Sequence, residues 1–319
     1  MNAEHPASSQ PRGTHKRLGV VLLAGYLLLY AVFLLGMNRT WHFDVAEPLF
    51  ILAVLGGAFS LVAWLLTIRT TPLDHSVVNP RRELQLLLLY LLPLAAYITW
   101  GGSALRNLAP TDPWNAVIVV LGKVIVFVII PAWLMHALFG YGLRDLAPIS
   151  FRRRDLLTLL GMSVLLLGFQ AIFGRGLHDI LQAHLPASTL VIGAPIAFVW
   201  LALEAGVVEE FFFRVLLQSR LSAALRSELG GIVLMSLLFG LAHAPGLYLR
   251  TSLTQEGLPP HPPLLMAIGY SIVITSVAGF FFGVLWARTR SFALVVLVHA
   301  MADLLPDLLP TLRSLQLLR

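Results

Sequence analysis

The sequence predicts an all-α membrane protein, a polytopic bundle of eight or nine transmembrane helices around an intramembrane polar cavity. Of its 319 residues, 58% are hydrophobic and only 12% are charged, which is more apolar surface than a soluble domain of this size needs. Several apolar stretches approach the ~20 residues that cross a ~30 Å hydrocarbon core. These stretches are continuous and rich in Leu and Val, which predicts helices, because the strands of a membrane barrel alternate between apolar and polar residues.

Nine apolar stretches predict the spans in order along the chain. Their expected ranges are 18–37, 48–68, 84–100, 116–139, 155–173, 190–218, 229–246, 266–287 and 291–310. The third stretch is short and carries Pro93, which is why the count is eight or nine. The last contains Pro306 and Pro310, and because proline disrupts the preceding helical turn, we expect the end of that helix to be broken or only partly inserted.

The basic residues gather in every second loop. They include Arg12, Lys16 and Arg17 before the first span, Arg69, Arg81 and Arg82 after the second, Arg152, Arg153 and Arg154 after the fourth, and Arg288 and Arg290 after the eighth. The positive-inside rule therefore predicts a multi-pass protein of the cell membrane with a cytoplasmic N-terminus. The same distribution accounts for the net charge of +6, so the bilayer, rather than a nucleic acid, is the expected partner.

The informative polar residues concentrate after about residue 195, which suggests a division of the chain into four parts. We expect a mobile cytoplasmic tail over 1–17, a scaffold of transmembrane helices over 18–189, a catalytic helical core over 190–310 and a C-terminal tail over 311–319. The chain has no cysteine, which excludes disulfides, a thiol nucleophile and a metal site with thiolate ligands.

Adjacent carboxylates inside an apolar span are the first candidate site. Glu209 and Glu210 lie in the run WLALEAGVVEEFFFRVLLQ, and an ionisable residue within the membrane indicates a functional site by default. Neighbours on a helix diverge by about 100°, so the two cannot face one point. Arg214 follows Glu210 by one turn in the favourable order for an ion pair. We therefore assign Glu210 and Arg214 to a supporting pair and leave Glu209 free to face the bundle.

Three further polar residues occur in later apolar spans. His243 lies in FGLAHAPG, near a helix end that Pro245 and Gly246 are expected to terminate. His299 and Asp303 are four residues apart in LVLVHAMADLLP and share a helical face. Each histidine alone is equally well explained by a hydrogen bond within the packing. Together with Glu209 they are expected to converge, because polar groups in lipid must find one another.

Two chemistries suit this set of residues. In the first, Glu209 is the general base, His243 holds and polarises a water, and His299 with Asp303 stabilises the oxyanion of a cleaved peptide bond. In the second, the Glu and His residues bind a metal such as Zn²⁺, which activates the water. The spacing fits no zinc signature and HExxH is absent, so we favour the first chemistry and expect no cofactor.

Three motifs resemble those of a known family. EEFFFR (209–214) has the form EExxxR, FGLAH (239–243) has FxxxH, and HAMAD (299–303) has Hxxx(N/D). In this order they resemble the CPBP family, also called Abi or CAAX-protease-like, of glutamate intramembrane endopeptidases, over about 195–305. The resemblance implies that Glu209 and His243 activate water, that the last motif forms the oxyanion side, and that the substrate is a membrane-anchored protein or peptide.

The third motif departs from the eukaryotic prenyl-protein enzymes of this family, which carry Asn where this chain has Asp303. An ionised Asp accepts hydrogen bonds but cannot donate one to an oxyanion. We therefore expect Asp303 to orient His299 and to leave donation to the imidazole. The departure also argues against a true prenyl-CAAX substrate.

Two other functions are compatible with a polar intramembrane cluster. An ion- or proton-coupled transporter could use the same Glu and His residues, although transporters usually show paired repeats with broken helices, and no such repeat is visible. A non-catalytic scaffold is disfavoured because Glu209, His243 and His299 are all present. The sequence therefore favours an intramembrane endopeptidase.

Overall fold

The computed structural model describes residues 16–75, 77–109, 111–249 and 258–318, and these residues form helices joined by short loops. Within those ranges, nine helical stretches are long and apolar enough to cross a membrane, which confirms the all-α bundle and the larger of the two expected counts. The predicted tail over 1–17 lies outside the described residues except at its end, where Lys16 begins the first helix.

The first five spans form the N-terminal part of the bundle. Their elements are α1 (Lys16–Trp41); α2 (Ala46–Ile51), η1 (Leu52–Phe59) and α3 (Ser60–Leu66); α4 (Pro80–Ala96), η2 (Tyr97–Gly101) and α5 (Gly102–Leu108); α6 (Trp114–Val124), η3 (Ile125–Ile129) and α7 (Ile130–Phe139); and α9 (Arg153–Phe173), with the short helix α8 (Leu143–Leu146) before it. The η segments are π-helical turns that continue the neighbouring α-helices.

The last four spans contain all six candidate residues. They are α11 (Ala187–Leu201), η4 (Ala202–Val207), η5 (Glu210–Gln218) and α12 (Ser219–Leu225); α13 (Glu228–Tyr248); α14 (Leu264–Tyr270), η6 (Ser271–Thr275) and α15 (Ser276–Thr289); and α16 (Phe292–Ser314). The short helix α10 (Gly176–Gln182), which the sequence did not predict, precedes them and packs against α16.

Two expectations about helix ends were wrong. Pro245 does not terminate α13, which continues to Tyr248. Pro306 and Pro310 do not break α16, which runs without interruption to Ser314, so residues 311–314 of the expected C-terminal tail are helical. Surrounding helices can stabilise a proline-containing helix in a membrane protein, and α9, α10 and α11 all pack against α16.

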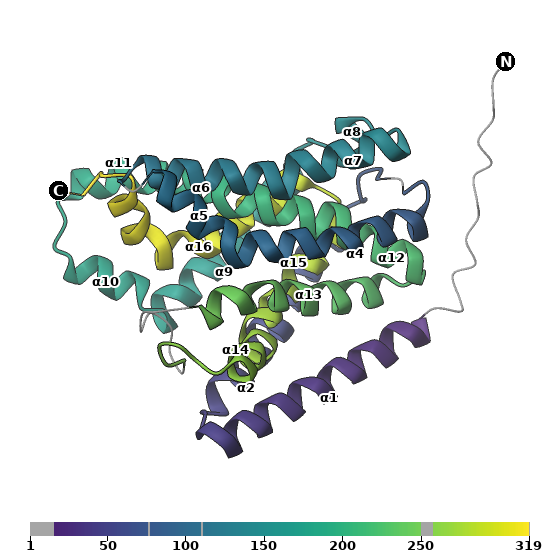
Figure 1. The fold of residues 1–319 in the computed structure, drawn as a ribbon, viewed down its shortest axis with the longest axis horizontal. Helices are drawn as coiled ribbons and strands as arrows, with labels where there is room; N and C mark the ends of the chain where they lie inside the picture. Colours follow the sequence, from purple (N-terminus) through teal and green to yellow (C-terminus); the bar gives the residue numbers. More distant parts are fainter. Residues whose placement is uncertain (1–15, 76, 110, 250–257, 319) are drawn as a thin grey trace.

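Most spans run lengthwise through the molecule, so their ends collect at two opposite ends (Figure 1). We call one the Arg-rich end; it contains the chain near residues 66–80, 139–153, 225–228 and 289–292. Its described arginines are Arg17, Arg69, Arg81, Arg82, Arg144, Arg152, Arg153, Arg154, Arg226, Arg288 and Arg290. The opposite end, called the Arg-poor end, contains the loops near residues 42–45, 109–113 and 174–186 and the end of α16.

Small residues let the helices of the C-terminal half approach closely. A side chain at Gly206 of η4 would meet the carbonyl oxygen of Val296 in α16 at 2.8 Å, and one at Gly240 of α13 would meet the backbone of Ser276 in α15 at 2.8 Å. Close approach through glycine is typical of helix packing in membranes, where dispersion contacts replace the hydrophobic effect. Gly206 thereby brings the helix that carries Glu209 against the helix that carries His299.

Candidate active site

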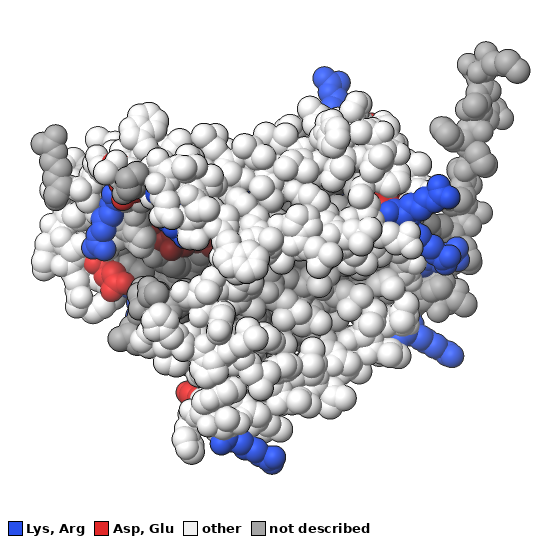
Figure 2. Space-filling view, viewed as in Figure 1, with Lys and Arg blue, Asp and Glu red and all other residues white. Residues whose placement is uncertain are grey.

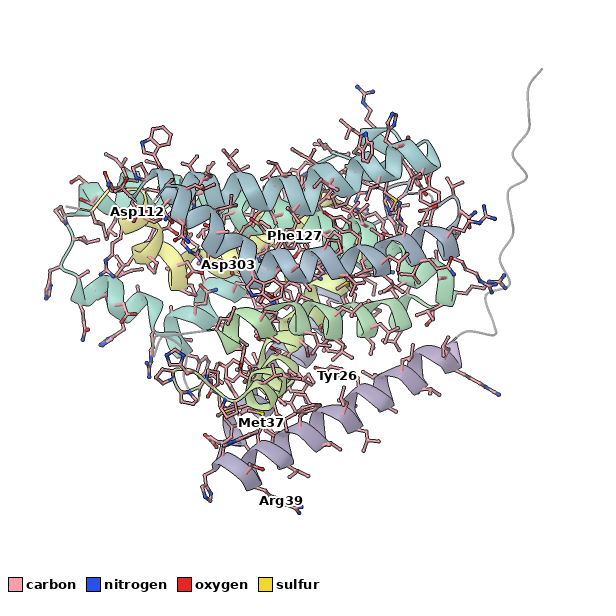
Figure 3. The ribbon with its side chains drawn as sticks, in the orientation of Figure 1. Tyr26, Met37, Arg39, Asp112, Phe127 and Asp303 are labelled. Atoms are coloured by element: carbon pink, nitrogen blue, oxygen red, sulfur yellow. The ribbon has the colours of Figure 1, made fainter. Side chains whose placement is uncertain are left out.

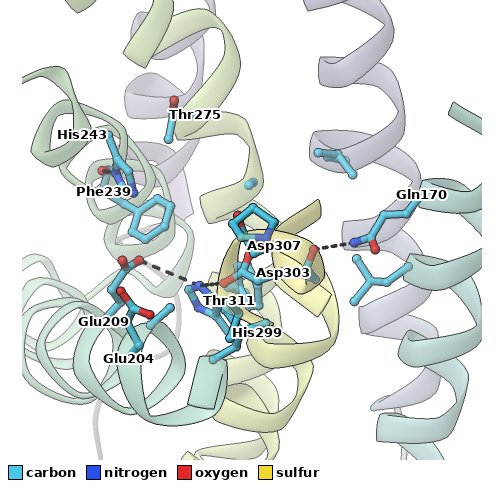
Figure 4. A pocket seen from close by; sticks show the side chains of 18 of the residues that line it. Gln170, Glu204, Glu209, Phe239, His243, Thr275, His299, Asp303, Asp307 and Thr311 are labelled. Carbon is cyan, nitrogen blue, oxygen red and sulfur yellow. Dashed lines mark hydrogen bonds and ion pairs between the residues drawn. The ribbon is translucent and has the colours of Figure 1, made fainter. Parts of the chain in front are cut away.

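The six predicted residues come together around one cavity of about 680 Å³ (Figure 4). Glu209, His243, His299 and Asp303 line it directly. Glu210 and Arg214 are completely buried behind this lining. These side chains come from three different spans, so the convergence that the intramembrane polar residues predicted is present in the structure.

The adjacent carboxylates face different surroundings. The Glu209 side chain is 20% exposed and lines the cavity, whereas that of Glu210 is fully buried. One Glu210 oxygen, Oε2, lies 3.2 Å from Nε of Arg214, and the other, Oε1, lies 2.7 Å from Nδ1 of His299. Glu210 therefore links the arginine to the histidine of the third motif, while Glu209 remains available to the cavity.

Arg214 is held by charge and by aromatic faces. Its guanidinium nitrogens have no hydrogen-bond acceptor in the described part of the chain. The guanidinium carbon lies 4.7 Å from the ring centre of Phe239 and 5.6 Å from that of Phe282. Such cation–π contacts strengthen when water is excluded. These two rings also contact the catalytic candidates, since Phe239 packs on His243 and Phe282 stacks on His299.

Both ring nitrogens of His299 contact carboxylates. Nδ1 contacts Glu210, and Nε2 lies 3.3 Å from Oδ2 of Asp303 and 3.9 Å from Oε2 of Glu209. An imidazole can donate hydrogen bonds from both nitrogens only in its protonated form. Nε2 thus lies near two carboxylates that line the cavity, those of Asp303 and Glu209. The contact with Asp303 is the one expected of a residue that orients the ring.

His243 has its ring fixed from one side. Its Nδ1 lies 2.8 Å from the carbonyl oxygen of Phe239, and because a carbonyl oxygen only accepts, Nδ1 must donate. In the neutral ring, Nε2 is then a hydrogen-bond acceptor. No ion pair or hydrogen bond joins His243 to Glu209 within the described residues, although both line the same cavity. This arrangement can offer two acceptors to one water molecule.

Three charged residues of the cavity were not predicted from the sequence. Lys123 of α6 lies 3.1 Å from Oε1 of Glu204, whose Oε2 accepts a hydrogen bond from Trp200 at 2.7 Å. Asp307 lies one turn beyond Asp303 on the same face of α16 and also lines the cavity. All three occur inside apolar spans, so the rule that identified Glu209 could also have identified them.

A second, smaller cavity of about 250 Å³ adjoins the same residues. It shares Lys123, Glu209 and His243 with the first, and the remaining lining is mainly apolar. Glu209 and His243 thus separate a polar chamber from an apolar one. Among the described residues, no group of three or more His, Asp or Glu side chains could hold a metal ion.

Residues 191–305 match the family model described as "Rce1-like: Type II CAAX prenyl endopeptidase Rce1-like". This region is therefore similar to the CAAX-protease family over about a third of the chain. The match confirms the resemblance carried by the three motifs, and it supports an endopeptidase activity on membrane-associated proteins. Residues 1–190 lie outside it. No curated protein and no solved structure matches the chain.

Proposed function

We propose that this protein is an intramembrane endopeptidase of the CAAX type in which Glu209 and His243 activate water without a metal. The observation that carries the proposal is the convergence of Glu209, His243 and His299, from three separate spans, at one cavity. The substrate would be a membrane-anchored protein or peptide cut near its C-terminus or its membrane segment. The apolar chamber beside Glu209 offers a site for a hydrophobic side chain next to the scissile bond.

In the proposed reaction, Glu209 accepts a proton from the water while the water oxygen attacks the peptide carbonyl carbon. His243 accepts a hydrogen bond from the same water and holds it in place. The carbonyl oxygen becomes an oxyanion, which replaces Asp303 as the acceptor of the hydrogen on Nε2 of His299. The intermediate then collapses, the carbon–nitrogen bond breaks, and the amine leaves with the proton that Glu209 had accepted.

The polar groups around His299 support this reaction because they hold its ring in position. Glu210 holds Nδ1 of His299 at 2.7 Å, and Asp303 contacts Nε2 at 3.3 Å. Together they fix the ring so that its donor faces the cavity. Arg214 balances the charge of Glu210 and lies against the rings of Phe239 and Phe282. These two rings in turn pack against the rings of His243 and His299.

The direct test compares membrane proteins of cells that express the intact chain with those of cells that express Glu209→Gln. The amide keeps the size of the side chain but removes the base, so we expect Glu209-dependent fragments to fall by about 10³-fold, within the range typical of a lost acid–base group. Glu228→Gln is the matched control, because Glu228 is 55% exposed and pairs with Arg290 outside the cavity. It should leave the fragments unchanged.

Repeating the comparison with 1,10-phenanthroline tests the role of a metal. Fragments that depend on Glu209 and persist with the chelator would support the metal-free mechanism and identify a substrate. Loss of the fragments with the chelator would contradict it and place the Glu and His residues in a metal site. A chain that folds but yields no Glu209-dependent fragment would contradict the endopeptidase proposal itself.

A further inference from the structure

The main cavity lies in one half of the bundle. Helices α9, α13 and α16 all run from the Arg-rich end to the Arg-poor end (Figure 1). In each of these helices the residues that line the cavity lie toward the Arg-poor end. On α9 they are Leu166, Phe169 and Gln170, within the last eight residues, and on α13 they are Phe239 and His243. The cavity therefore extends from the catalytic candidates toward the Arg-poor end.

A polar stripe on α16 follows the cavity to that end. Asp303, Asp307, Thr311 and Ser314 recur at intervals of three or four residues, and all of them line the cavity. Because such residues share one helical face, the stripe continues from His299 to the last residue of the helix. Figure 2 shows a hollow at the left, Arg-poor end of the molecule, at which both acidic and basic side chains are visible.

The space between the active site and the Arg-rich end is filled. Phe282 stacks on His299 at 4.8 Å between ring centres. One turn further on α15 lies Trp286, which is fully buried and donates its indole hydrogen to Oγ of Ser219 at 3.0 Å. The buried Gln218 amide donates to the carbonyl oxygen of Gly283 at 2.8 Å.

A buried ion pair closes the same end. Nε of Arg220 lies 2.9 Å from Oε2 of Glu83, and neither side chain is exposed. The Tyr141 hydroxyl donates to the same carboxylate at 2.9 Å. These contacts join α4, α12 and the loop after α7, so a packed layer extends across the bundle between His299 and the Arg-rich end.

We propose that the active site is reached from the Arg-poor end and not from the Arg-rich end. The positive-inside rule assigns the Arg-rich end to the cytoplasm, so the open end faces away from it. On the basis of the proposed function, the substrate is then a membrane-anchored protein whose scissile bond lies on the extracytoplasmic side. The polar stripe would receive the polar segment beside the anchor.

The absence of cysteine from the chain allows access to be measured with single cysteines. Ser314→Cys lies at the outer end of the stripe, Ala205→Cys lines the cavity next to the active site, and Ile149→Cys is an 84% exposed control in a loop at the Arg-rich end. Each full-length variant would be treated with a membrane-impermeant maleimide in spheroplasts and in inverted membrane vesicles.

We expect labelling of Ser314→Cys and Ala205→Cys in spheroplasts at least tenfold faster than in inverted vesicles, and the reverse for Ile149→Cys. Labelling of Ala205→Cys from the same side as Ile149→Cys would overturn the proposal, as would labelling of Ile149→Cys in spheroplasts. If Ala205→Cys fails to fold, Thr311→Cys provides the second position on the path.

Cleavage provides a separate measurement. Two substrates with the same anchor would present the same scissile sequence on the cytoplasmic or the extracytoplasmic side, and we expect at least a tenfold preference for the second. A preference for the cytoplasmic substrate would overturn the inference. If neither substrate is cut and Glu209→Gln changes no fragment, the proposed function fails, while the labelling result still decides which end is open.

Discussion

Two buried Glu–Arg pairs at different depths of the bundle show why a buried charge alone does not make an active site. In the cluster of Glu83, Tyr141 and Arg220 near the Arg-rich end, both oxygens of the carboxylate receive hydrogen bonds. Burial raises the pKa of Tyr141, so its hydroxyl remains a donor. This cluster lines neither of the two cavities beside Glu209.

The candidate catalytic cluster has a similar pair, Glu210 and Arg214, but it also contains Glu209, a carboxylate that takes no part in the pair. Glu209 lines two cavities, and its nearest ion-pair contact is 3.9 Å away at His299. The difference is access, because Glu209 faces the two cavities whereas Glu83 and Glu210 are fully buried. Figure 3 shows Asp303 on the same side of the bundle as Asp112, whose loop is at the Arg-poor end.

Apart from Glu209→Gln, Arg214→Met should have the largest effect, because it lowers both stability and activity. The change leaves Glu210 buried without its counter-charge, which typically costs about 3–5 kcal/mol. It also removes the cation that rests on Phe239 and Phe282, and the resulting shift of both histidines should lower kcat about 10²-fold. Thermal unfolding in nanodiscs and single-turnover cleavage would measure the two effects. Loss of stability with unchanged kcat would show that Arg214 has no positioning role.

Arg220→Met should change stability alone. Glu83 is then buried without its partner, so we expect a loss of about 3–5 kcal/mol with kcat of the folded fraction unchanged. In Glu83→Gln with Arg220→Met, the unpaired charge is gone and part of the loss should be recovered. The free energy of unfolding and the rate per folded molecule are the measurements. A kcat that fell as far as in Arg214→Met would remove the distinction between the two clusters.

His75 should make the stability of the Arg-rich end depend on pH. Burial, together with Arg220 and Arg290, lowers the pKa of His75 from 6.5 to about 3. Between these values the unfolded chain binds a proton that the folded chain does not, so this contribution is complete above pH 6.5 and is lost as pH falls toward 3. Its loss between pH 7 and pH 5 amounts to about 2 kcal/mol.

The variant His75→Gln should therefore show a shallower fall in unfolding temperature over that pH range than the intact chain. The His178→Gln variant, which makes the same change at an exposed histidine of α10 at the opposite end of the bundle, is the matched comparison and leaves His75 in place. Identical pH profiles for His75→Gln and the intact chain would contradict the assignment.

Asp303→Asn should have the smallest effect. The amide oxygen can still accept from Nε2 of His299, which now lies 3.3 Å from Asp303, so we expect less than a tenfold loss of kcat, or under ~1.4 kcal/mol. Asp303→Ala removes the acceptor and should cost more. If the Asn variant were as inactive as the Ala variant, the charge of Asp303 rather than its orienting contact would be required.

The sequence by itself determined the helical class, a count of eight or nine spans and six residues of the candidate site. Lipid forces apolar stretches into helices, and it makes each ionisable residue within them costly, so both features are visible in the local sequence. The Glu210–Arg214 contact follows from spacing on a single helix. Lys123, Glu204 and Asp307 were accessible to the same reasoning.

Only the tertiary structure decided which of these charges are sealed and which reach a cavity. The link from Glu210 to His299 joins residues 89 positions apart, and the close approach at Gly206 depends on the path of α16. The persistence of α13 and α16 beyond their prolines has the same origin. Packing between distant spans sets all of these features, and no local sequence pattern records which helices will be neighbours.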